Sequence, residues 1–348
     1  MEGRAGSPGG RPCFMWKTVI DAPFLGSVLP AGLLSRPKHK SSTKIRVLLM
    51  NRQDRRRQLS DLSKSDAMYS SFPSDMRAAT ELHRQGRMKE AADTLRKITK
   101  VYADHPDVRV AWSNLGATLQ GMGKLDDAVA ALKKARALKP DHPPPHHNLG
   151  MALAQQGKLD EAIESLQRAC ELDPNFRDAW AGLALVREQT GEIPLAAEAW
   201  QRAVQADPNA VEPLFNFGNC LFRLGMLQEA ANAFQGCLAR RPNMPEAVYA
   251  LGRVHEEAGS FDTAAEAYLA ATRIAPQVGQ GHAQLAGLIV HIAGSDLAKA
   301  QGLADTYRQT HPDSPIVPQL FGRLEEIAKA AADAPAAAEP AEEATAEG

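Results

Sequence analysis

The sequence predicts an all-α solenoid of about seven helix-turn-helix units, with one further helix at its C-terminal end. Three residue series predict this fold, each with a period of 34 residues and all in the same phase. They are prolines (Pro106, Pro140, Pro174, Pro208, Pro242 and Pro276), glycines (Gly123, Gly157, Gly191, Gly225 and Gly259) and alanines (Ala128, Ala162, Ala196, Ala230 and Ala264). A fixed period of this length is typical of helical repeats that stack to bury a continuous core.

Each residue type has a physical role in such a unit. A glycine ends the first helix because it adopts a positive φ angle without a steric penalty. A proline ends the second helix, since its ring removes a hydrogen-bond donor and disfavours the α conformation of the preceding residue. Residues at helical spacing, such as Ala196, Trp200 and Ala203, form the stripe that faces the core. Small residues mark the close approach within a hairpin, and bulkier ones fill the space toward the next unit (Leu132, Leu166, Trp200, Phe234 and Tyr268).

The two end units deviate from the pattern, as terminal repeats usually do. The first unit keeps Gly86 and Ala91 but has three extra residues before Pro106, and we expect these to lengthen its second helix over residues 99–104. The last unit has Gly294 and Ala300, with two residues inserted before Pro312. Residues 316–331 have the apolar spacing of one more amphipathic helix, which we expect to cap the exposed end of the stack.

The units resemble tetratricopeptide repeats, whose pattern is W-x2-L-G-x2-Y, followed by G, A-x3-F-x2-A and P. One unit of this chain reads Trp112, Leu115, Gly116, Leu119, Gly123, Ala128, Leu132, Ala135 and Pro140, and the following units keep the spacing. The fourth unit departs from the family, because Leu183-Ala184 replaces the Leu-Gly pair and loosens the packing slightly. The resemblance covers residues 73–314 and implies a right-handed α-solenoid.

The charge distribution divides the chain into parts. Residues 1–72 hold thirteen bases and five acids, whereas residues 332–348 hold five acids and no base. We therefore expect a basic, disordered leader over residues 1–72, the repeat array over 73–314, the capping helix over 315–331 and a disordered Ala/Pro/Glu tail over 332–348. Two alternatives remain open for the leader. One is a start of translation at Met50, and the other is a targeting peptide, against which Asp21, Pro23 and Pro30 interrupt the apolar stretch.

Composition and motifs exclude several classes of function. The chain has 40 Lys and Arg against 41 Asp and Glu, which excludes a uniformly basic nucleic-acid binder. No apolar stretch approaches the ~20 residues that span a bilayer. The GxSxG, HExxH and GxxxxGK[ST] motifs are absent, and so is a GxGxxG between a strand and a helix. We therefore expect no enzymatic activity and no cofactor.

The histidines and cysteines are candidates for special sites. Three histidines crowd the inter-repeat turn over residues 141–147, where a metal site is the alternative to an ordinary turn with His146 in the place of Trp112 and Trp180. The cysteines have no CxxC spacing, and Cys170, Cys220 and Cys237 are expected to fill the core (Cys13 lies in the leader). Reduced cysteines and the lack of a clean signal peptide favour the cytoplasm.

The first helix of each repeat forms the concave wall of a repeat superhelix. The resemblance places one inward residue of each unit two positions before the glycine of the Leu-Gly pair: Asn114, Asn148, Gly182, Asn216, Ala250 and Gln284. The asparagines are similar to the ladder with which the repeat domain of the O-linked N-acetylglucosamine transferase grips peptide backbones. An amide offers two donors and an acceptor, which suits a peptide unit. Local capping or packing is the alternative role.

The same face carries a mixture of residues that is typical of protein interfaces (Asn219, Arg223, Tyr249, Arg253, Glu256 and Glu257, with Phe215 and Phe222 nearby). The lysines that relatives use to clamp a chaperone's C-terminal carboxylate are missing from the matching positions, which argues against that kind of partner (Ser113, His147, Ala181, Phe215 and Tyr249).

The sequence therefore predicts a non-enzymatic scaffold that binds an extended segment of a partner protein in its groove. The candidate contact residues are Asn114, Asn148, Asn216, Asn219, Arg223, Tyr249, Arg253 and Glu256. Two alternatives remain: an accessory, substrate-presenting module of a glycosyl- or sulfotransferase system, and a scaffold that self-assembles. We expect no specific nucleic-acid binding, because the basic leader lacks interleaved aromatic residues and would make only salt-sensitive contacts.

Overall fold

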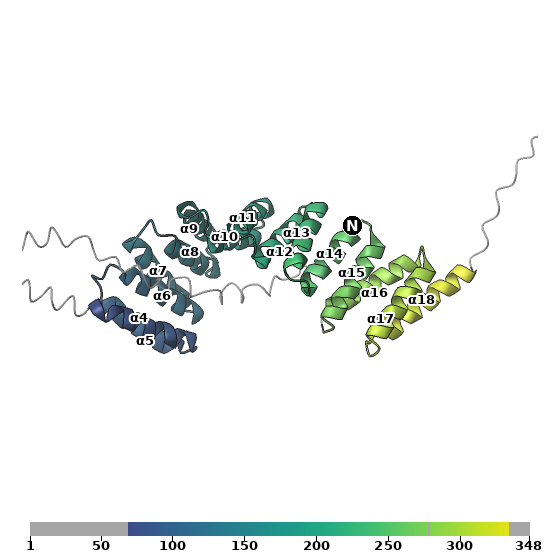
Figure 1. Ribbon diagram of the computed structural model, residues 1–348, viewed down its shortest axis with the longest axis horizontal. Coiled ribbons are helices and arrows are strands. Elements are labelled where there is room, and N and C mark those ends of the chain that lie inside the picture. The colour runs from purple at the N-terminus through teal and green to yellow at the C-terminus, as the bar shows by residue number, and fades with distance from the viewer. Residues whose placement is uncertain (1–68, 278, 334–348) are drawn as a thin grey trace, which may run out of the picture. The chain divides into compact units, whose positions relative to one another are not determined.

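The computed structural model describes residues 69–277 and 279–333, and this part of the chain consists of fifteen helices and no strands (Figure 1). The described residues form two compact units, one up to residue 186 and the other from residue 187 onward. The helices of the first unit are α4 (Phe72–Arg84), α5 (Met88–Val101), α6 (Val108–Gly121), α7 (Leu125–Leu138), α8 (Pro143–Gln155), α9 (Leu159–Leu172) and most of α10 (Arg177–Thr190).

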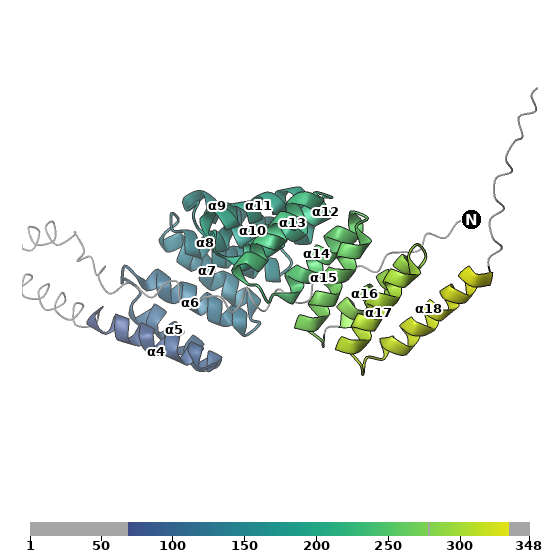
Figure 2. The same ribbon diagram turned by 45° about the vertical axis from the view of Figure 1, so that its right-hand side comes forward.

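The second unit begins with the last turn of α10. It continues with α11 (Ile193–Ala206), α12 (Val211–Arg223), α13 (Leu227–Arg240), α14 (Pro245–Glu257), α15 (Phe261–Ile274), α16 (Gly279–Ala293), α17 (Leu297–Thr310) and α18 (Ile316–Asp333). Within each unit, consecutive helices lie side by side as hairpins, as Figures 1 and 2 show. This arrangement confirms the predicted all-α repeat fold.

The glycine turns follow the predicted period. Six glycines have φ between +73° and +82°, and each of them lies between the two helices of a hairpin (Gly86, Gly123, Gly157, Gly191, Gly225 and Gly259). L-residues with a side chain rarely adopt this conformation, so the glycine sets the position of each turn. Gly294, at the corresponding turn of the last repeat, does not have a positive φ angle. The turn before α17 ends instead with Asp296, whose carboxylate accepts a hydrogen bond from the backbone N–H of Lys299 at 3.0 Å.

Close packing within the hairpins requires a second set of glycines on the first helices. A Cβ atom on Gly116 would lie 2.4 Å from the side chain of Leu132, and one on Gly252 would lie 2.6 Å from the ring of Tyr268. Both larger side chains are completely buried. In the repeats that have a glycine at this position (Gly116, Gly150, Gly218 and Gly252), it therefore makes room for the bulky residue sixteen positions later.

Aromatic ring nitrogens satisfy the carbonyl groups of several inter-repeat prolines. In the first unit, Nε2 of His146 lies 2.7 Å from the oxygen of Pro140, and the indole N–H of Trp180 donates to the oxygen of Pro174 at 2.9 Å. In the second unit, His282 repeats the contact with the oxygen of Pro276 at 2.9 Å. Since a carbonyl oxygen can only accept, the nitrogen of each histidine carries the proton. The turn carbonyl is thus satisfied without a helical partner.

The ends of the described part differ from the sequence expectations in two details. Helix α5 ends at Val101, so the three extra residues of the first repeat lie in the following turn and do not lengthen the helix. Packed structure also begins a few residues before position 73, because Phe72 is buried and stacks on His105 with ring centroids 4.0 Å apart. The rest of the expected leader and most of the expected tail lie outside the described residues.

Helix α18 covers the last hairpin. Val317, Leu320 and Leu324 are buried in one cluster with residues of α16 and α17. The contact closes the apolar end of the stack, which agrees with the predicted capping helix. No helix among residues 69–277 and 279–333 combines the length and the apolar character needed to cross a bilayer.

Candidate functional site

The first helices of successive repeats in the second unit present one continuous polar face. An ion pair joins α10 to α12, with Nη1 of Arg223 lying 3.6 Å from Oε2 of Glu188. A cation–π contact joins α12 to α14, because the guanidinium carbon of Arg253 lies 4.4 Å from the ring centroid of Phe222. A hydrogen bond between the side chains of Tyr249 and Gln284 joins α14 to α16.

We call this face the polar wall. It comprises Glu188, Glu212, Phe215, Asn216, Asn219, Phe222, Arg223, Glu246, Tyr249, Arg253, Glu256, Glu257 and Gln284. Helical geometry explains why these positions lie together, since residues three, four and seven apart share one side of a helix. On α12, Glu212, Asn216 and Asn219 follow this spacing, and the residues 34 positions later occupy the same side of α14.

Two carboxylates of the wall are anchored from below by the aromatic core. The indole N–H of Trp200 donates to Oε1 of Glu188 at 2.6 Å, and the hydroxyl of Tyr268 donates to Oε2 of Glu256 at 2.5 Å. Both aromatic side chains are almost completely buried. Burial, and then the neighbouring Glu256 carboxylate, raises the pKa of Tyr268, so the phenol keeps its proton and remains the donor. These two carboxylates are therefore held in fixed positions by the core of their own repeat.

Asn216 differs from the other polar residues of the wall. Its side chain is only 3% exposed, yet its Nδ2 group has no hydrogen-bond acceptor among the described residues. A buried donor without a partner costs about 1–3 kcal/mol. By contrast, the side chain of Asn148, at the same repeat position in the first unit, has hydrogen-bond partners for both its nitrogen and its oxygen. Its Nδ2 donates to Oγ of Ser113 at 3.1 Å, and its Oδ1 lies 3.1 Å from Nδ1 of His147.

The structure divides the residues predicted from sequence between the two units. Asn114 on α6 and Asn148 on α8 belong to the first unit, where both are half-buried. The main-chain oxygen of Asn114 also accepts a hydrogen bond from the hydroxyl of Thr118 at 2.8 Å. The other six lie on the polar wall of the second unit (Asn216, Asn219, Arg223, Tyr249, Arg253 and Glu256).

Three acidic residues of the wall were not among the residues predicted from the sequence. Glu188 was missed, although it pairs with Arg223 and accepts from Trp200. Glu212 and Glu246 were missed as well, although they occupy the same repeat position 34 residues apart. That spacing is the signal that would have found them, because equivalent positions face the same way in successive repeats.

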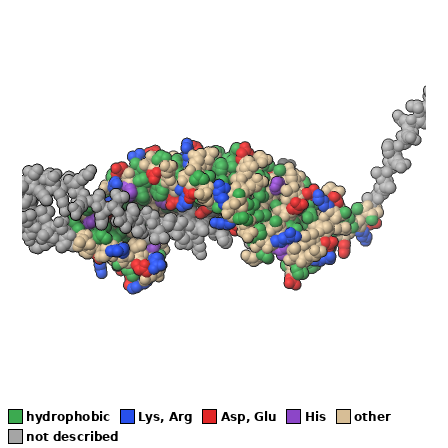
Figure 3. Space-filling model, viewed as in Figure 1, with side chains coloured by type: hydrophobic (Ala, Val, Ile, Leu, Met, Phe, Trp, Pro, Cys, Tyr) green, Lys and Arg blue, Asp and Glu red, His purple; other side chains and the backbone are tan. Residues whose placement is uncertain are grey.

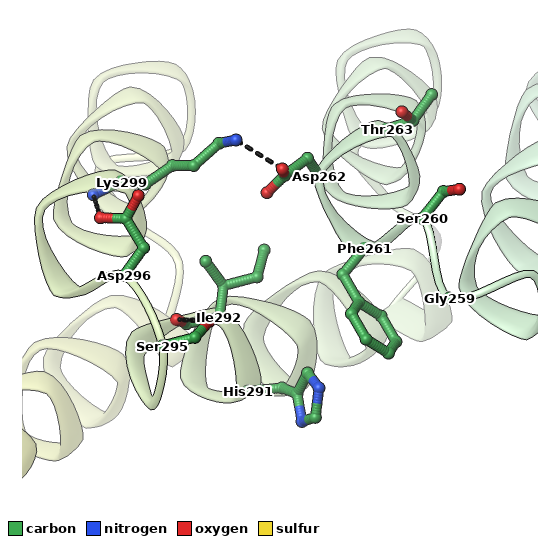
Figure 4. A pocket seen from close by; sticks show the side chains of 10 residues that line it. All are labelled: Gly259, Ser260, Phe261, Asp262, Thr263, His291, Ile292, Ser295, Asp296 and Lys299. Carbon is green, nitrogen blue, oxygen red and sulfur yellow. Dashed lines mark hydrogen bonds and ion pairs between the residues drawn. The ribbon is translucent and has the colours of Figure 1, made fainter.

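A cavity of about 400 Å³, lined by no residue of the wall, lies at the turns that precede α15 and α17 (Figure 4). Nζ of Lys299 lies 2.5 Å from Oδ2 of Asp262, and the hydrogen bond and ion pair with this carboxylate raise the pKa of the lysine. Phe261 and His291 lie next to each other, with ring centroids 4.4 Å apart. Lys299 and Asp262, which both line the cavity, are thus paired with each other.

The histidines and cysteines considered from sequence have structural contacts. Nε2 of His146 donates to the carbonyl of Pro140, and the ring of His147 lies against that of Phe176, 5.3 Å between centroids. No group of three potential metal ligands occurs among residues 69–277 and 279–333. Cys170, Cys220 and Cys237 are buried, as predicted for core residues. Burial raises the pKa of Cys220 to about 12 and that of Cys237 to about 11, so both thiols stay protonated near neutral pH.

On the face that Figure 3 shows, basic and acidic side chains are interspersed among hydrophobic ones over the helices, and neither sign gathers into one large patch.

Family comparisons agree with the repeat geometry. A family model described as "TPR repeat" matches residues 150–191, and two models described as "Tetratricopeptide repeat" match residues 75–141 and 215–278. No relative was found among curated proteins.

Solved structures with a TM-score above 0.5 share the fold. The C-terminal part of a TPR repeat-containing protein from Cytophaga hutchinsonii is similar with a TM-score of 0.56 and 15% identity, over 71% of this chain and 99% of that one. The Pseudomonas aeruginosa PilF protein is similar with a TM-score of 0.54 and 18% identity, over 64% of this chain and 99% of that one. YrrB, described as a TPR protein with an unusual peptide-binding site, gives a TM-score of 0.49 and 24% identity, over 56% and 98%.

Proposed function

Because this chain is a tetratricopeptide repeat protein, we propose that it is a non-enzymatic scaffold whose polar wall binds an extended segment of a partner protein. The family alone does not identify the partner, because a fold does not determine function. The proposal therefore depends on the composition and the geometry of the wall.

The observation that carries the proposal is the combination of linked side chains on α12 and α14. Arg253 stacked on Phe222, half-buried Phe215 and Tyr249, and the amide of Asn219 provide aromatic surface, a cation and hydrogen-bonding groups on one face. Aromatic residues and arginine are enriched at interfaces and dominate their energetics. An extended backbone leaves its own N–H and C=O groups free to bond to such side chains. This is the set of contacts that a bound segment requires.

The unsatisfied donor of Asn216 supports a ligand role for the same face. Its buried Nδ2 group has no acceptor among the described residues, so folding alone does not account for an amide at this position. A carbonyl oxygen of a bound segment would supply the acceptor. Asn114 and Asn148 are the candidate asparagines of the first unit, and we propose that they have a supporting role in partner contact there.

Affinity capture with the full chain tests this function. We expect the wild-type chain to recover a partner from native lysate, and we expect Asn216→Ala and Arg253→Ala together to reduce its recovery at least about tenfold, since interface hot spots contribute ~2 kcal/mol or more each. Arg202→Ala on the second helix α11 is the matched control, because Arg202 is exposed and lies outside the wall. Equal loss in the control, or undiminished capture by the wall variant, would refute the assignment of the wall.

The same experiment separates this role from the two alternatives. Recovery of a glycosyl- or sulfotransferase would favour the substrate-presenting module, and recovery of a tagged second copy of this chain would favour self-assembly. A cytoplasmic location also remains part of the proposal, supported by the buried free thiols of Cys220 and Cys237.

A further inference from the structure

We infer that the polar wall takes a basic segment, an extended stretch in which Arg or Lys side chains are interspersed with apolar ones. This inference rests on the proposed function, because it names the chemistry of the segment that the wall would hold. The wall carries five carboxylates and only two guanidinium groups. Such an excess of negative charge favours basic partners and opposes acidic ones.

The five carboxylates fall into two groups. Glu188 and Glu256 are held by their own repeats, because they accept hydrogen bonds from Trp200 and Tyr268. The other three, Glu212, Glu246 and Glu257, are exposed and form no ion pair or hydrogen bond with the described residues. They follow the stripe of α12 and α14 that forms the wall. Three carboxylates therefore face the space beside the wall without a neutralising cation from the described chain.

Both cations of the wall have internal partners. Arg223 lies 3.6 Å from Glu188, and Arg253 lies over the ring of Phe222. An acidic segment would thus meet one cation that is already paired with a carboxylate, and Arg253 as the other. A basic segment meets the three exposed carboxylates without displacing anything.

A second and independent observation places a ligand backbone on the same stripe. Asn216 lies one helical turn after Glu212, and its buried Nδ2 group lacks an acceptor among the described residues. The missing acceptor matches a main-chain carbonyl of an extended segment. Phe215 and Phe222 are half-buried neighbours and offer apolar surface to the uncharged side chains of that segment.

The second helices of the same unit do not share this charge excess. The second helices α11, α13 and α15 carry four acids and three bases, which leaves them nearly neutral. One of those acids, Asp262, is also neutralised by Lys299. The second helices therefore supply a control surface with the same residue types in the same unit.

Fluorescence anisotropy with the full chain tests the inference. The probe is a labelled synthetic peptide with four Arg-Ser-Leu-Ser repeats, and its counterpart has Glu in place of every Arg. The wall variant combines Glu212→Gln, Glu246→Gln and Glu257→Gln. The control combines Glu198→Gln, Glu229→Gln and Glu266→Gln, three exposed residues of α11, α13 and α15, so that both variants change the net charge equally.

We expect the wild type and the control to bind the basic probe with the same Kd, and the wall variant to bind it roughly tenfold more weakly, as for the loss of three exposed ion pairs. Binding should weaken further as salt is raised toward ~1 M, where screening acts over about 3 Å. Equal weakening in the control variant, or equally tight binding of the Glu probe, overturns the inference. Circular dichroism spectra and thermal melting establish that both variants remain folded.

The failure of this inference differs from the failure of the proposed function. If Asn216→Ala and Arg253→Ala abolish partner capture while the basic probe does not respond to the three Glu→Gln changes, the wall binds a segment of other chemistry and the inference is wrong. If the substitutions in the wall change neither partner capture nor the binding of the basic probe, both proposals are wrong.

Discussion

Replacing Gly252 by alanine should destabilise the second unit, although alanine is the better helix former. The added Cβ would lie 2.6 Å from Cδ1 and Cε1 of Tyr268, whereas ordinary van der Waals contacts begin near 3.4 Å. The ring has little freedom to move, because its hydroxyl is bonded to Glu256 and the ring of Tyr249 lies 5.2 Å away, centroid to centroid. Overpacking of this kind costs about 1–3 kcal/mol.

The gain in helix propensity opposes this cost. Alanine in place of glycine in a helix interior stabilises by ~1 kcal/mol. The net effect of Gly252→Ala is therefore a loss of about 0–2 kcal/mol in the free energy of unfolding. Gly287→Ala is the matched control, since Gly287 is an exposed residue of α16 with no atom within 4 Å of the added Cβ, and it should gain about 0.5–1 kcal/mol.

Urea unfolding of the full chain, followed by circular dichroism, measures the difference between the two variants. Because repeat arrays need not unfold in one step, amide hydrogen exchange in α14 and α15 should accompany the midpoints. We expect Gly252→Ala to lower the midpoint and to speed exchange there, and Gly287→Ala to raise the midpoint. If Gly252→Ala stabilises the protein as much as Gly287→Ala does, the contact between Gly252 and Tyr268 does not constrain the packing.

Three further predictions follow from the contacts and the pKa shifts. Tyr268→Phe removes the hydroxyl that donates to Glu256 and should cost ~1 kcal/mol by urea unfolding, and an unchanged midpoint would mean that water replaces the bond without loss. Asn216→Leu removes a buried unsatisfied donor, so it should leave stability unchanged or raise it while weakening partner capture, and a clear loss of stability would show that the amide has a structural partner. Lowering the pH from about 8 to about 5 should destabilise the first unit, because burial lowers the pKa of five of its histidines (His83, His105, His142, His146 and His147). The stability that these neutral histidines contribute is present above their unfolded pKa of ~6.5 and is lost as the pH falls below that value. Hydrogen exchange that is equally slow in α6 to α9 at both pH values, after correction for intrinsic rates, would contradict this prediction.

The sequence predicted the fold because each repeat signal has a local cause. The glycine turns are an example, since a positive φ angle is a property of one residue and its neighbours. The expectation for the first repeat was wrong for the opposite reason. Three extra residues before Pro106 can extend a helix or a turn, and only the packing of Phe72, Tyr102 and His105 places them in the turn.

The candidate site was only partly predictable from the sequence. The 34-residue spacing assigns Asn216, Tyr249 and Arg253 to one kind of position, but it does not say which of them has a partner. Glu188 with Trp200, and Glu256 with Tyr268, share a spacing of twelve residues that could have been found in the sequence. At the same positions of the intervening repeat, Phe222 precedes Phe234, which has no polar group to satisfy. The missing acceptor of Asn216 depends on the coordinates of every neighbour and has no sequence signal.

Site-specific photo-crosslinking tests most directly whether the polar wall binds the partner. A photoreactive phenylalanine analogue would replace Asn219 on the wall of the full chain, or Gln201 on the exposed side of α11 as the control. We predict that irradiation links the partner segment to position 219 and leaves position 201 unlinked. Crosslinks at position 201 with none at position 219 would contradict the account, because they would place the partner on the second helices.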